Sequence, residues 1–281
     1  MKYFIDTEFI EGPQKERFPI SLFRKQTPNT IDLISIGIVA EDGREYYAIS
    51  KDFNLKEAWN RYQVKEQTAF EKYHDFSGRR EYWIRDKVLK PIFQELLAMY
   101  IEEYKKTLNS KYFIGTIVND EFSYNTFKFL LNRYGKTNKE IAEEIKTFCH
   151  SELHLAKRKG GLDFTKQEAT PEFYAYYADY DWVVFCWLFG RMIDLPEGFP
   201  MYCRDLKQML DDKPLVFDIT VVRYGDNYIC SCDPYYTSWD KHIDYPKQDP
   251  NTHHNAIEDA RWNKKLFEFL LKKQIKWTIK N

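Results

Sequence analysis

Two acidic residues, Asp6 and Glu8, stand two positions apart at the end of an apolar segment that predicts a β-strand over residues 2–6. Side chains alternate along a strand, so residues two apart point to the same face. Two carboxylates side by side repel each other unless a cation lies between them, and Mg²⁺ and similar hard ions prefer such oxygen ligands. The pair therefore fits a metal site, although a solvated strand end would also carry it.

A third acidic residue, Asp181, stands where a predicted strand over residues 172–178 gives way to a predicted helix over residues 181–192. α/β folds place ligands at the carboxyl ends of their strands, which favours a role in the same site. On its own, Asp181 is better explained as an N-cap or first-turn aspartate that the helix dipole stabilises. Asp179, two residues earlier, is the rival for any catalytic role.

The fourth acidic candidate, Asp259, follows His254 by five positions, so the two cannot face one site from a continuous helix. Asn255 is a good N-cap and Glu258 falls at the third helical position, a variant of the capping box. We therefore expect a helix over residues 255–273, with His254 in the loop before it and Asp259 in its first turns. A surface histidine beside an acidic helix start is the alternative.

Together these residues match what two-metal phosphodiester hydrolysis requires: Asp6, Glu8, Asp181, Asp259 and His254. Two divalent ions about 4 Å apart would activate a water and stabilise the leaving oxygen. A histidine that titrates near neutrality could take the proton of that water. The combination therefore favours a metal-dependent nuclease.

Three short motifs carry these residues: Asp6-Thr7-Glu8-Phe9, Ala178-Asp179-Tyr180-Asp181-Trp182 and His254-Asn255-Ala256-Ile257-Glu258-Asp259-Ala260. In type and order they resemble the motifs of the DEDDh 3′–5′ exonucleases of the ribonuclease-H-like fold, which include ribonuclease T and oligoribonuclease. The tyrosine-using sister group would have Tyr in place of Asn255, and many DEDDh members have Asn in place of Asp179.

A wider likeness covers about half of the chain, over the segments FIDTEFIE, IDLISIGIVAEDGREYYAIS, IRDKVLKP and AYYADYDW. Within the DEDDh family these segments most resemble the mycobacterial-type polyadenylate-specific 3′-exoribonucleases. The resemblance implies a ribonuclease-H-like α/β fold, with a mixed central sheet flanked by helices and with helical and β-hairpin insertions. It also implies a 3′–5′ exoribonuclease that releases nucleoside 5′-monophosphates from single-stranded RNA.

The same resemblance assigns roles to the acidic residues. Asp6, Glu8 and Asp259 would ligate the inner of two Mg²⁺ (or Mn²⁺) ions. Asp6 would bridge to the second ion, and Asp181 would support that ion directly or through water. His254 would be the general base.

Two residues are expected to contact the substrate, Glu8 and Phe9. Phe9 follows the first motif directly and could act as a wedge for the terminal base, since base–aromatic stacking is worth ~1–3 kcal/mol. Packing of Phe9 under the sheet is the alternative. The RNA-to-DNA choice stays open, because recognition of the 2′-hydroxyl depends on pocket geometry.

The other elements follow from hydrophobic spacing and turn signals. The expected strands are residues 31–40, 45–50 and 111–118, with a hairpin over residues 215–232. The expected helices are residues 80–107, 121–133, 138–150 and 204–211, with Pro91 kinking or dividing the first. No linker is evident, so we expect one domain over residues 1–281, with insertions at about 98–140 and 212–250.

Charge and composition exclude several classes of protein. The chain has 281 residues, 42 basic and 43 acidic, for a formal net charge of −1. That balance excludes a protein held on nucleic acid mainly by charge, for which a pI above about 9 is expected. It is still compatible with an enzyme that binds a short nucleic-acid strand through local basic groups, such as Arg79-Arg80 and residues 157–159. Such groups, however, usually form a solvated face.

The cysteines and apolar segments bear on location. Five cysteines are odd in number and form no CxxC pair, so neither a disulfide framework nor a Cys-based zinc site is expected. The longest apolar stretch, residues 182–190, is half of the roughly 18 residues that a membrane span needs. We therefore expect a soluble, cytoplasmic protein without a membrane partner.

Two alternatives to an exoribonuclease remain from the sequence. One is a 3′–5′ DNA exonuclease, with single-stranded DNA as the substrate. The other is a catalytically inactive nucleic-acid-binding module on the same fold, which would gain nothing from four carboxylates facing a polyanion. The full acidic set therefore favours an enzyme, while the oligomeric state, a homodimer included, stays open.

Overall fold

The structure, a computed structural model, describes residues 1–14, 28–64, 80–108, 121–158, 170–212, 218–224, 227–233, 239–241, 244–250, 252–272 and 278–280. Five strands form a central sheet in the order β3-β2-β1-β6-β7. They are β1 (Lys2–Gly12), β2 (Thr30–Ala40), β3 (Glu45–Ile49), β6 (Glu172–Ala175) and β7 (Arg204–Asp205). β1 pairs antiparallel with β2 and parallel with β6, so the sheet is mixed and the predicted α/β class is confirmed.

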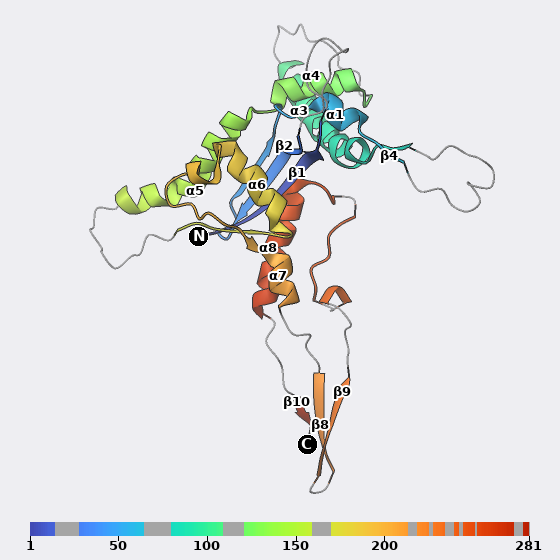
Figure 1. The fold of residues 1–281 in the computed structure, drawn as a ribbon, viewed down its shortest axis with the longest axis vertical. Helices are drawn as coiled ribbons and strands as arrows, with labels where there is room; N and C mark the ends of the chain where they lie inside the picture. The colour runs from blue at the N-terminus through green and yellow to red at the C-terminus, as the bar shows by residue number, and fades with distance from the viewer. Residues whose placement is uncertain are drawn as a thin grey trace, which may run out of the picture.

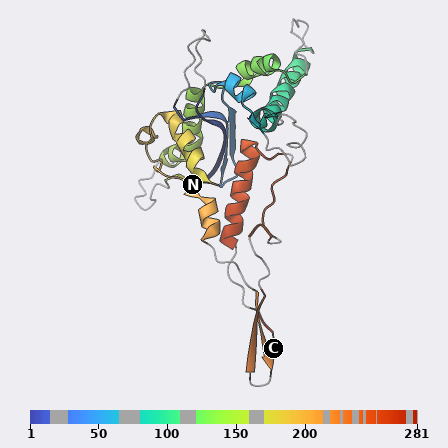
Figure 2. The same cartoon turned by 45° about the vertical axis from the view of Figure 1, so that its right-hand side comes forward.

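Helices cover both faces of this sheet, as Figures 1 and 2 show. One face carries α5 (Asn138–Arg158) and α6 (Ala178–Phe189). The other face carries α7 (Leu206–Asp211) and α8 (Ala256–Lys272). Further along that second face lie α1 (Leu55–Asn60), the π-helical turn η2 (Ile84–Leu89), α3 (Lys90–Leu108) and α4 (Tyr124–Tyr134).

Alternation along β1 divides its side chains between the two faces. Tyr3 and Ile5 belong to the buried cluster with α5 and α6, and Phe4 belongs to the cluster with α8. Asp6 and Glu8 have the same parity as Phe4, so they point to the side of the sheet that α8 covers. The prediction that Asp6 and Glu8 share a face therefore agrees with the strand.

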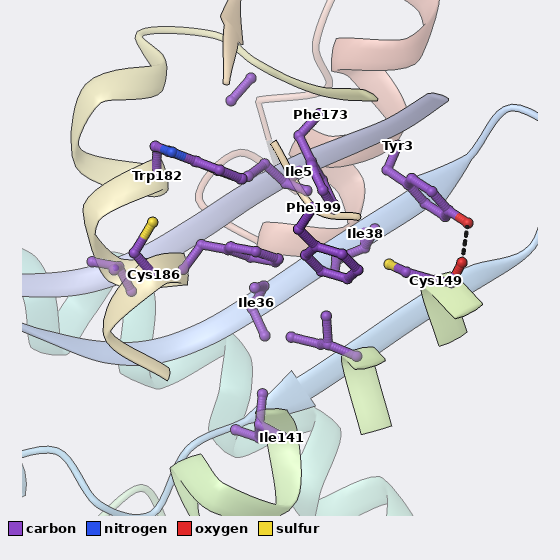
Figure 3. Packing of buried hydrophobic residues seen from close by; sticks show 14 of the residues in the cluster. Tyr3, Ile5, Ile36, Ile38, Ile141, Cys149, Phe173, Trp182, Cys186 and Phe199 are labelled. Atoms are coloured by element: carbon purple, nitrogen blue, oxygen red, sulfur yellow. Dashed lines mark hydrogen bonds between the residues drawn. The ribbon is translucent and has the colours of Figure 1, made fainter. Parts of the chain in front are cut away.

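The core under α5 and α6 combines aromatic rings with aliphatic side chains (Figure 3). The ring of Phe173 lies 5.3 Å from that of Trp182, centroid to centroid. The hydroxyl of Tyr3 donates a hydrogen bond to the carbonyl of Cys149 at 3.1 Å, which ties β1 to α5. Cys149 and Cys186 are buried free thiols.

The first helical turn of α8 packs directly on the backbone of β2, and a glycine makes this possible. A Cβ atom at Gly37 would overlap the carbonyl oxygen of Ala256. Further along α8, the side-chain amide of Asn263 donates a hydrogen bond to the carbonyl of Ile5 at 2.8 Å. Since α8 carries Asp259 and β1 carries Asp6, these contacts set how closely the two acidic residues approach.

We expect Gly37→Ala to destabilise the protein by about 3 kcal/mol, because an overlap of backbone with backbone cannot be relieved by a side-chain rotation. Chemical denaturation measures the loss. Gly43→Ala is the comparison, since a Cβ there would meet nothing within 4 Å and its φ of +91° is the source of its strain, about 1–2 kcal/mol. An equal loss in the two variants would mean that the tight packing of α8 is not the cause.

β1 is longer than predicted. The apolar segment suggested a strand over residues 2–6, whereas the ladder with β2 continues to Gly12. Asp6 and Glu8 therefore lie inside a strand and not at its end. The free edge beside them arises because β6 stops at Ala175, so Asp6 has no strand neighbour on that side.

Three helix boundaries also differ from prediction. α6 begins at Ala178 rather than residue 181, and α5 continues to Arg158 rather than ending at residue 150. The helix expected over residues 80–107 starts only at η2, after the short strand β5 (Arg80–Glu81). Pro91 lies just after η2. Because proline cannot donate the helical hydrogen bond, the helix is interrupted there, and the interruption takes the form of the π-helical turn before it.

The predicted hairpin is confirmed as β8 (Asp218–Tyr224) paired antiparallel with β9 (Asn227–Asp233). A strand not predicted, β10 (Thr278–Lys280), joins β8 in parallel, and this small sheet lies apart from the central sheet (Figure 1). β4 (Gln63–Val64) pairs with β5, and short 3₁₀ turns are η3 (Met192–Asp194) and η4 (Trp239–Lys241). The strand expected over residues 111–118 lies outside the described residues.

None of the helices in the described part of the chain is both long and apolar enough to cross a membrane.

Candidate active site

A pocket of about 630 Å³ opens beside β1, where β6 ends. Its walls come from β1, the first turns of α6 and α8, the segment before α8, and the strands β4 and β5 with the start of η2. The five residues expected to do chemistry all line it: Asp6, Glu8, Asp181, His254 and Asp259. Segments far apart in the sequence thus bring the predicted residues to one place.

Asp6 and Glu8 are neighbouring carboxyl groups, and both have raised pKa values. Burial raises the pKa of Glu8 to about 8, with further contributions from the charges of Asp259 and Asp181. Burial likewise raises the pKa of Asp6 well above its usual value, and the charges of Asp181 and Glu8 add to this. Without a cation, the pocket therefore resists full ionisation at neutral pH.

Asp181 is buried in the first turns of α6 and is fixed by its neighbours. Its Oδ1 accepts hydrogen bonds from the backbone N–H of Thr7 at 2.8 Å and from the Thr7 hydroxyl at 2.6 Å. Burial nevertheless raises the pKa of Asp181 to about 7, because it outweighs these hydrogen bonds. Asp179, in contrast, is exposed and does not line the pocket.

On the expectation from the sequence that this pocket hydrolyses RNA with bound metal, Asp181→Asn should lower turnover by roughly 10²-fold or more, since loss of a metal-supporting carboxylate costs several kcal/mol of transition-state stabilisation. Asp179→Asn should leave turnover within about two-fold, the range of an exposed substitution. Steady-state assays of the two variants side by side give the comparison. A larger loss in the Asp179 variant would show that the other aspartate does the chemistry.

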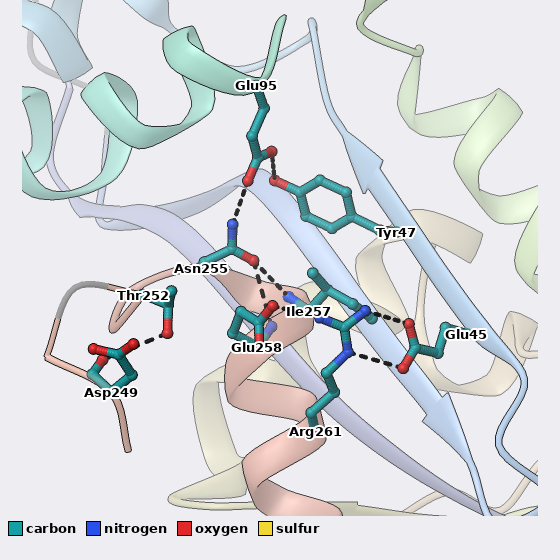
Figure 4. A network of polar contacts seen from close by, with 9 residues as sticks. All are labelled: Glu45, Tyr47, Glu95, Asp249, Thr252, Asn255, Ile257, Glu258 and Arg261. Carbon is teal, nitrogen blue, oxygen red and sulfur yellow. Dashed lines mark hydrogen bonds and ion pairs between the residues drawn. The ribbon is translucent and has the colours of Figure 1, made fainter. Parts of the chain in front are cut away.

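The N-cap of α8 is Asn255, as predicted. Its Oδ1 accepts hydrogen bonds from the backbone N–H groups of Ile257 and Glu258, at 3.2 and 3.4 Å. Its amide donates to the carboxyl group of Glu95 on α3, which also accepts the hydroxyl of Tyr47 at 3.0 Å (Figure 4). Glu95 and Tyr47 thus orient the Asn255 amide and fix where α8 begins.

The predicted capping box is only half formed. The side chain of Glu258 pairs with Arg261, one turn along α8, and not with the backbone at the helix start. A carboxylate does reach back, but it is that of Asp259, whose Oδ2 accepts the backbone N–H of His254 at 3.0 Å. The aspartate that lines the pocket therefore also holds the loop before the helix.

His254 has a left-handed backbone conformation, with φ 69°. Its Nδ1 lies 3.9 Å from Oε1 of Glu8, and its ring meets the edge of Trp83 at a centroid distance of 4.7 Å. Burial lowers the pKa of His254 to about 4, with further lowering by the charges of His253 and Lys87. The imidazole is therefore neutral at physiological pH, below the near-neutral titration that the sequence suggested.

The donor atoms suit a divalent cation. Glu8, His254 and Asp259 each offer a ligand atom within 4.8 Å of the other two. Among the described residues that line the pocket, Arg61 is the one lysine or arginine, and it pairs with Glu57 at 3.3 Å. Bound cations are therefore the natural balance for the four clustered carboxylates.

Sequence reasoning missed several polar residues of the pocket, among them Gln248. Its side-chain amide donates a hydrogen bond to Oδ1 of Asp259 at 3.0 Å. Gln248 lies in a loop rich in Pro, Asp and Tyr, where no periodicity or spacing marks a residue as functional. Only the fold brings it beside the carboxylate.

Exposed aromatic rings also line the pocket. Tyr62, Trp83, Tyr177 and Tyr180 are 44, 39, 63 and 52 % exposed. Phe9 is half-buried, packs against the core under α6, and lies 5.7 Å from the ring of Tyr180. Phe9 thus packs against the core, as one of the two expectations had it, and also borders the pocket, while its role as a wedge for a base stays a prediction. The other rings carried no sequence signal, because most aromatics in this chain are core residues.

The fold and pocket define an α/β protein whose acidic pocket is suited to divalent cations. Two curated proteins of Mycobacterium tuberculosis, from two strains and both named 3′-5′ exoribonuclease, are similar to this chain. Each is 25 % identical over 213 residues, which cover 76 % of this chain and 76 % of the relative. No protein-family profile matches the chain.

Proposed function

We propose that this chain is a divalent-metal-dependent 3′–5′ exoribonuclease of the DEDDh type, on a ribonuclease-H-like fold. The observation that carries the proposal is the convergence of four carboxylates and one neutral histidine in a single pocket. The names of the two mycobacterial relatives support 3′–5′ exoribonuclease activity and RNA as the substrate. The proposed reaction releases nucleoside 5′-monophosphates from the 3′ end of single-stranded RNA.

Asp6, Glu8 and Asp259 would hold the inner of two Mg²⁺ or Mn²⁺ ions. Asp6 would bridge to the second ion, and Asp181, held by Thr7, would support that ion directly or through water. When bound, such ions lower the pKa of a water and stabilise the charge that develops on the leaving oxygen. The four carboxylates would then be fully ionised, because the cations offset their mutual repulsion.

His254 would accept the proton of the attacking water. Its neutral imidazole is ready to do so at physiological pH, and the edge of Trp83 restrains the ring. Glu8 and Phe9 would contact the terminal nucleotide, with the Phe9 ring beside its base. In this arrangement the histidine moves a proton while the carboxylates hold the charge.

The raised pKa values predict how pH acts on the metal-free protein. A carboxyl group whose pKa is higher in the folded than in the unfolded state binds its proton more tightly in the folded state. As pH rises between those two pKa values, the free energy of unfolding therefore falls. For Glu8, with a pKa of about 8, and Asp181, with a pKa of about 7, that window runs from roughly pH 4 to pH 8. In EDTA these two groups should therefore lower the stability of the protein as pH rises through this range, most clearly above about pH 6.5, where the opposite contribution of His254 has ended.

The measurement is the difference in Tm between Mg²⁺ and EDTA as a function of pH. We expect it to grow by about 5 °C or more from pH 6 to pH 8.5, the scale of a few kcal/mol in a chain of this size. Using the difference removes titrations that the metal does not affect. A difference independent of pH would mean that the acidic pocket is not where the metal binds.

The test of the proposed reaction is product analysis with RNA and DNA oligonucleotides of matched sequence, in Mg²⁺ and in EDTA. Chromatography should show nucleoside 5′-monophosphates released from RNA, in Mg²⁺ only. Release from DNA alone would support a DNA exonuclease. Strand binding without any release would support an inactive binding module, and 3′-monophosphates would exclude the proposed mechanism.

Several further expectations stay predictions. They are the single domain over residues 1–281 with insertions at about 98–140 and 212–250, the cytoplasmic location and a possible homodimer.

A further inference from the structure

A surface beside the pocket combines exposed rings with cations. It consists of Tyr62 next to β4, Arg80 of β5, and Tyr82, Trp83 and Arg85 at the entry to η2. We call these five residues the aromatic–basic arm. Figure 1 shows β4 projecting beside α1 and α3.

The arm is continuous with the pocket. Tyr62 and Trp83 line the pocket wall and expose 44 and 39 % of their surface. The Tyr82 ring lies 5.8 Å from that of Tyr62, so the aromatic surface continues beyond the pocket. A strand whose 3′ end lies beside the carboxylates would meet these rings as it leaves the pocket.

The cations of the arm lie against its rings. The guanidinium of Arg80 is 4.6 Å from the centre of the Tyr62 ring, and that of Arg85 is 3.9 Å from the centre of the Tyr82 ring. Arg85 pairs with Asp86 at 3.0 Å, whereas Arg80 forms no ion pair with any described residue. Arg80 is therefore the arm's available partner for a phosphate.

Charge separates the arm from the opposite wall of the pocket. The start of α6 also exposes rings, at Tyr177 and Tyr180, but the charged side chains there are Asp179 and Asp181. On the side of the arm Arg80 and Arg85 stand beside the acids Glu81 and Asp86, so the arm, unlike the start of α6, offers a polyanion cations to contact. Rings that stack on bases, together with cations that contact the backbone, are the combination by which proteins hold single strands.

We propose that the aromatic–basic arm binds the single-stranded RNA on the 5′ side of the cleaved nucleotide. Bases stack on the exposed rings of Trp83 and Tyr62, Arg80 contacts a phosphate, and Arg85 holds the Tyr82 ring that packs beside Tyr62. This assignment rests on the proposed function, since it takes the pocket as the place where the 3′ end is hydrolysed.

The test is a length series of fluorescein-labelled RNA, from two to ten nucleotides, measured by fluorescence anisotropy in the hydrolysis-deficient Asp6→Asn background. Arg80→Ala should weaken binding of the ten-nucleotide RNA about ten-fold and lower the salt slope by about 0.7, the value for one lost phosphate contact on a single strand. Arg80→Lys should recover most of this loss, because a phosphate contact needs only the charge.

Two controls match these substitutions. Arg133→Ala removes an arginine that lies 5.6 Å from the ring of Tyr134 on α4, and it should leave RNA binding unchanged. Tyr62→Ala should weaken binding of the ten-nucleotide RNA about ten-fold, the loss expected for one stacked base. Phe129→Ala removes a ring of similar exposure, 42 %, that does not line the pocket, and should have no effect.

Activity on a dinucleotide separates failure of this proposal from failure of the proposed function. In the otherwise wild-type chain, Arg80→Ala should keep dinucleotide turnover while kcat/KM for the longer RNA falls about ten-fold. Intact RNA cleavage with no length-dependent loss in Arg80→Ala and Tyr62→Ala would overturn the arm and leave the enzyme. Absence of RNA cleavage by the wild-type chain would overturn the function, and the anisotropy series would still decide whether the arm binds RNA.

Discussion

Asp6→Asn is expected to abolish RNA hydrolysis, by at least about 10³-fold, and to make the metal-free protein more stable. The first effect follows because Asp6 would bridge both metal ions, and a neutral amide is a weak ligand for Mg²⁺. The second follows because burial and the charges of Asp181 and Glu8 raise the pKa of Asp6, so its ionised form destabilises the folded chain at neutral pH. The same residue would thus oppose folding in the metal-free protein and enable the proposed reaction.

Two measurements check this pair of effects. Turnover is compared in saturating Mg²⁺, and Tm is compared in EDTA at pH 8, where we expect a rise of about 5 °C. Asp32→Asn is the charge-matched control, since Asp32 lies on β2 outside this pocket, and it should change neither quantity. Full activity in the Asp6 variant would remove the basis for a metal site at β1.

His254→Ala is expected to lower turnover by about 10²–10⁴-fold, the usual range for loss of a general base. The histidine is neutral at physiological pH, so it can accept a proton, and it lies 3.9 Å from Glu8, whose carboxylate would stabilise the imidazolium that forms. The affinity for Mn²⁺, measured by titration calorimetry, should be largely unchanged. The pH dependence of the remaining activity should also become flatter on its acidic limb.

The geometry allows one other role for His254, which the same variant excludes or supports. Its ligand atom lies close enough to those of Glu8 and Asp259 to join a metal site. Loss of Mn²⁺ affinity in proportion to the loss of turnover would therefore make His254 a ligand instead of a base. His253→Ala is the matched control, because the His253 ring lies 3.9 Å from that of His254, and its effect should be several-fold at most.

Local patterns predicted the elements that carry the motifs. The antiparallel strands β1 to β3 follow from apolar runs and a turn signal, and the start of α8 follows from Asn255 as N-cap. The predicted element boundaries were wrong where contacts between distant segments determine them. β1 continues to Gly12 because β2 pairs with it, and α6 begins at Ala178 ahead of the expected residue.

The motifs singled out five residues that the structure gathers in one pocket, and their catalytic roles remain proposals. What the sequence left out depends on contacts between distant segments. Gln248 reaches Asp259 from a loop without pattern, and Trp83 meets His254 only because η2 packs beside the start of α8. The low pKa of His254 has the same origin, since burial by the fold is its main cause.

One time course tests the central claim most directly. RNA labelled at its 5′ end is incubated with the wild-type chain in Mg²⁺, in Mn²⁺ and in EDTA, beside the Asp6→Asn variant. We predict a ladder that shortens from the 3′ end one nucleotide at a time, in either metal, and no change in EDTA or with the variant. A ladder that persists in EDTA or in the variant, or RNA cut first at internal positions, would contradict a metal-dependent 3′–5′ exoribonuclease built on these carboxylates.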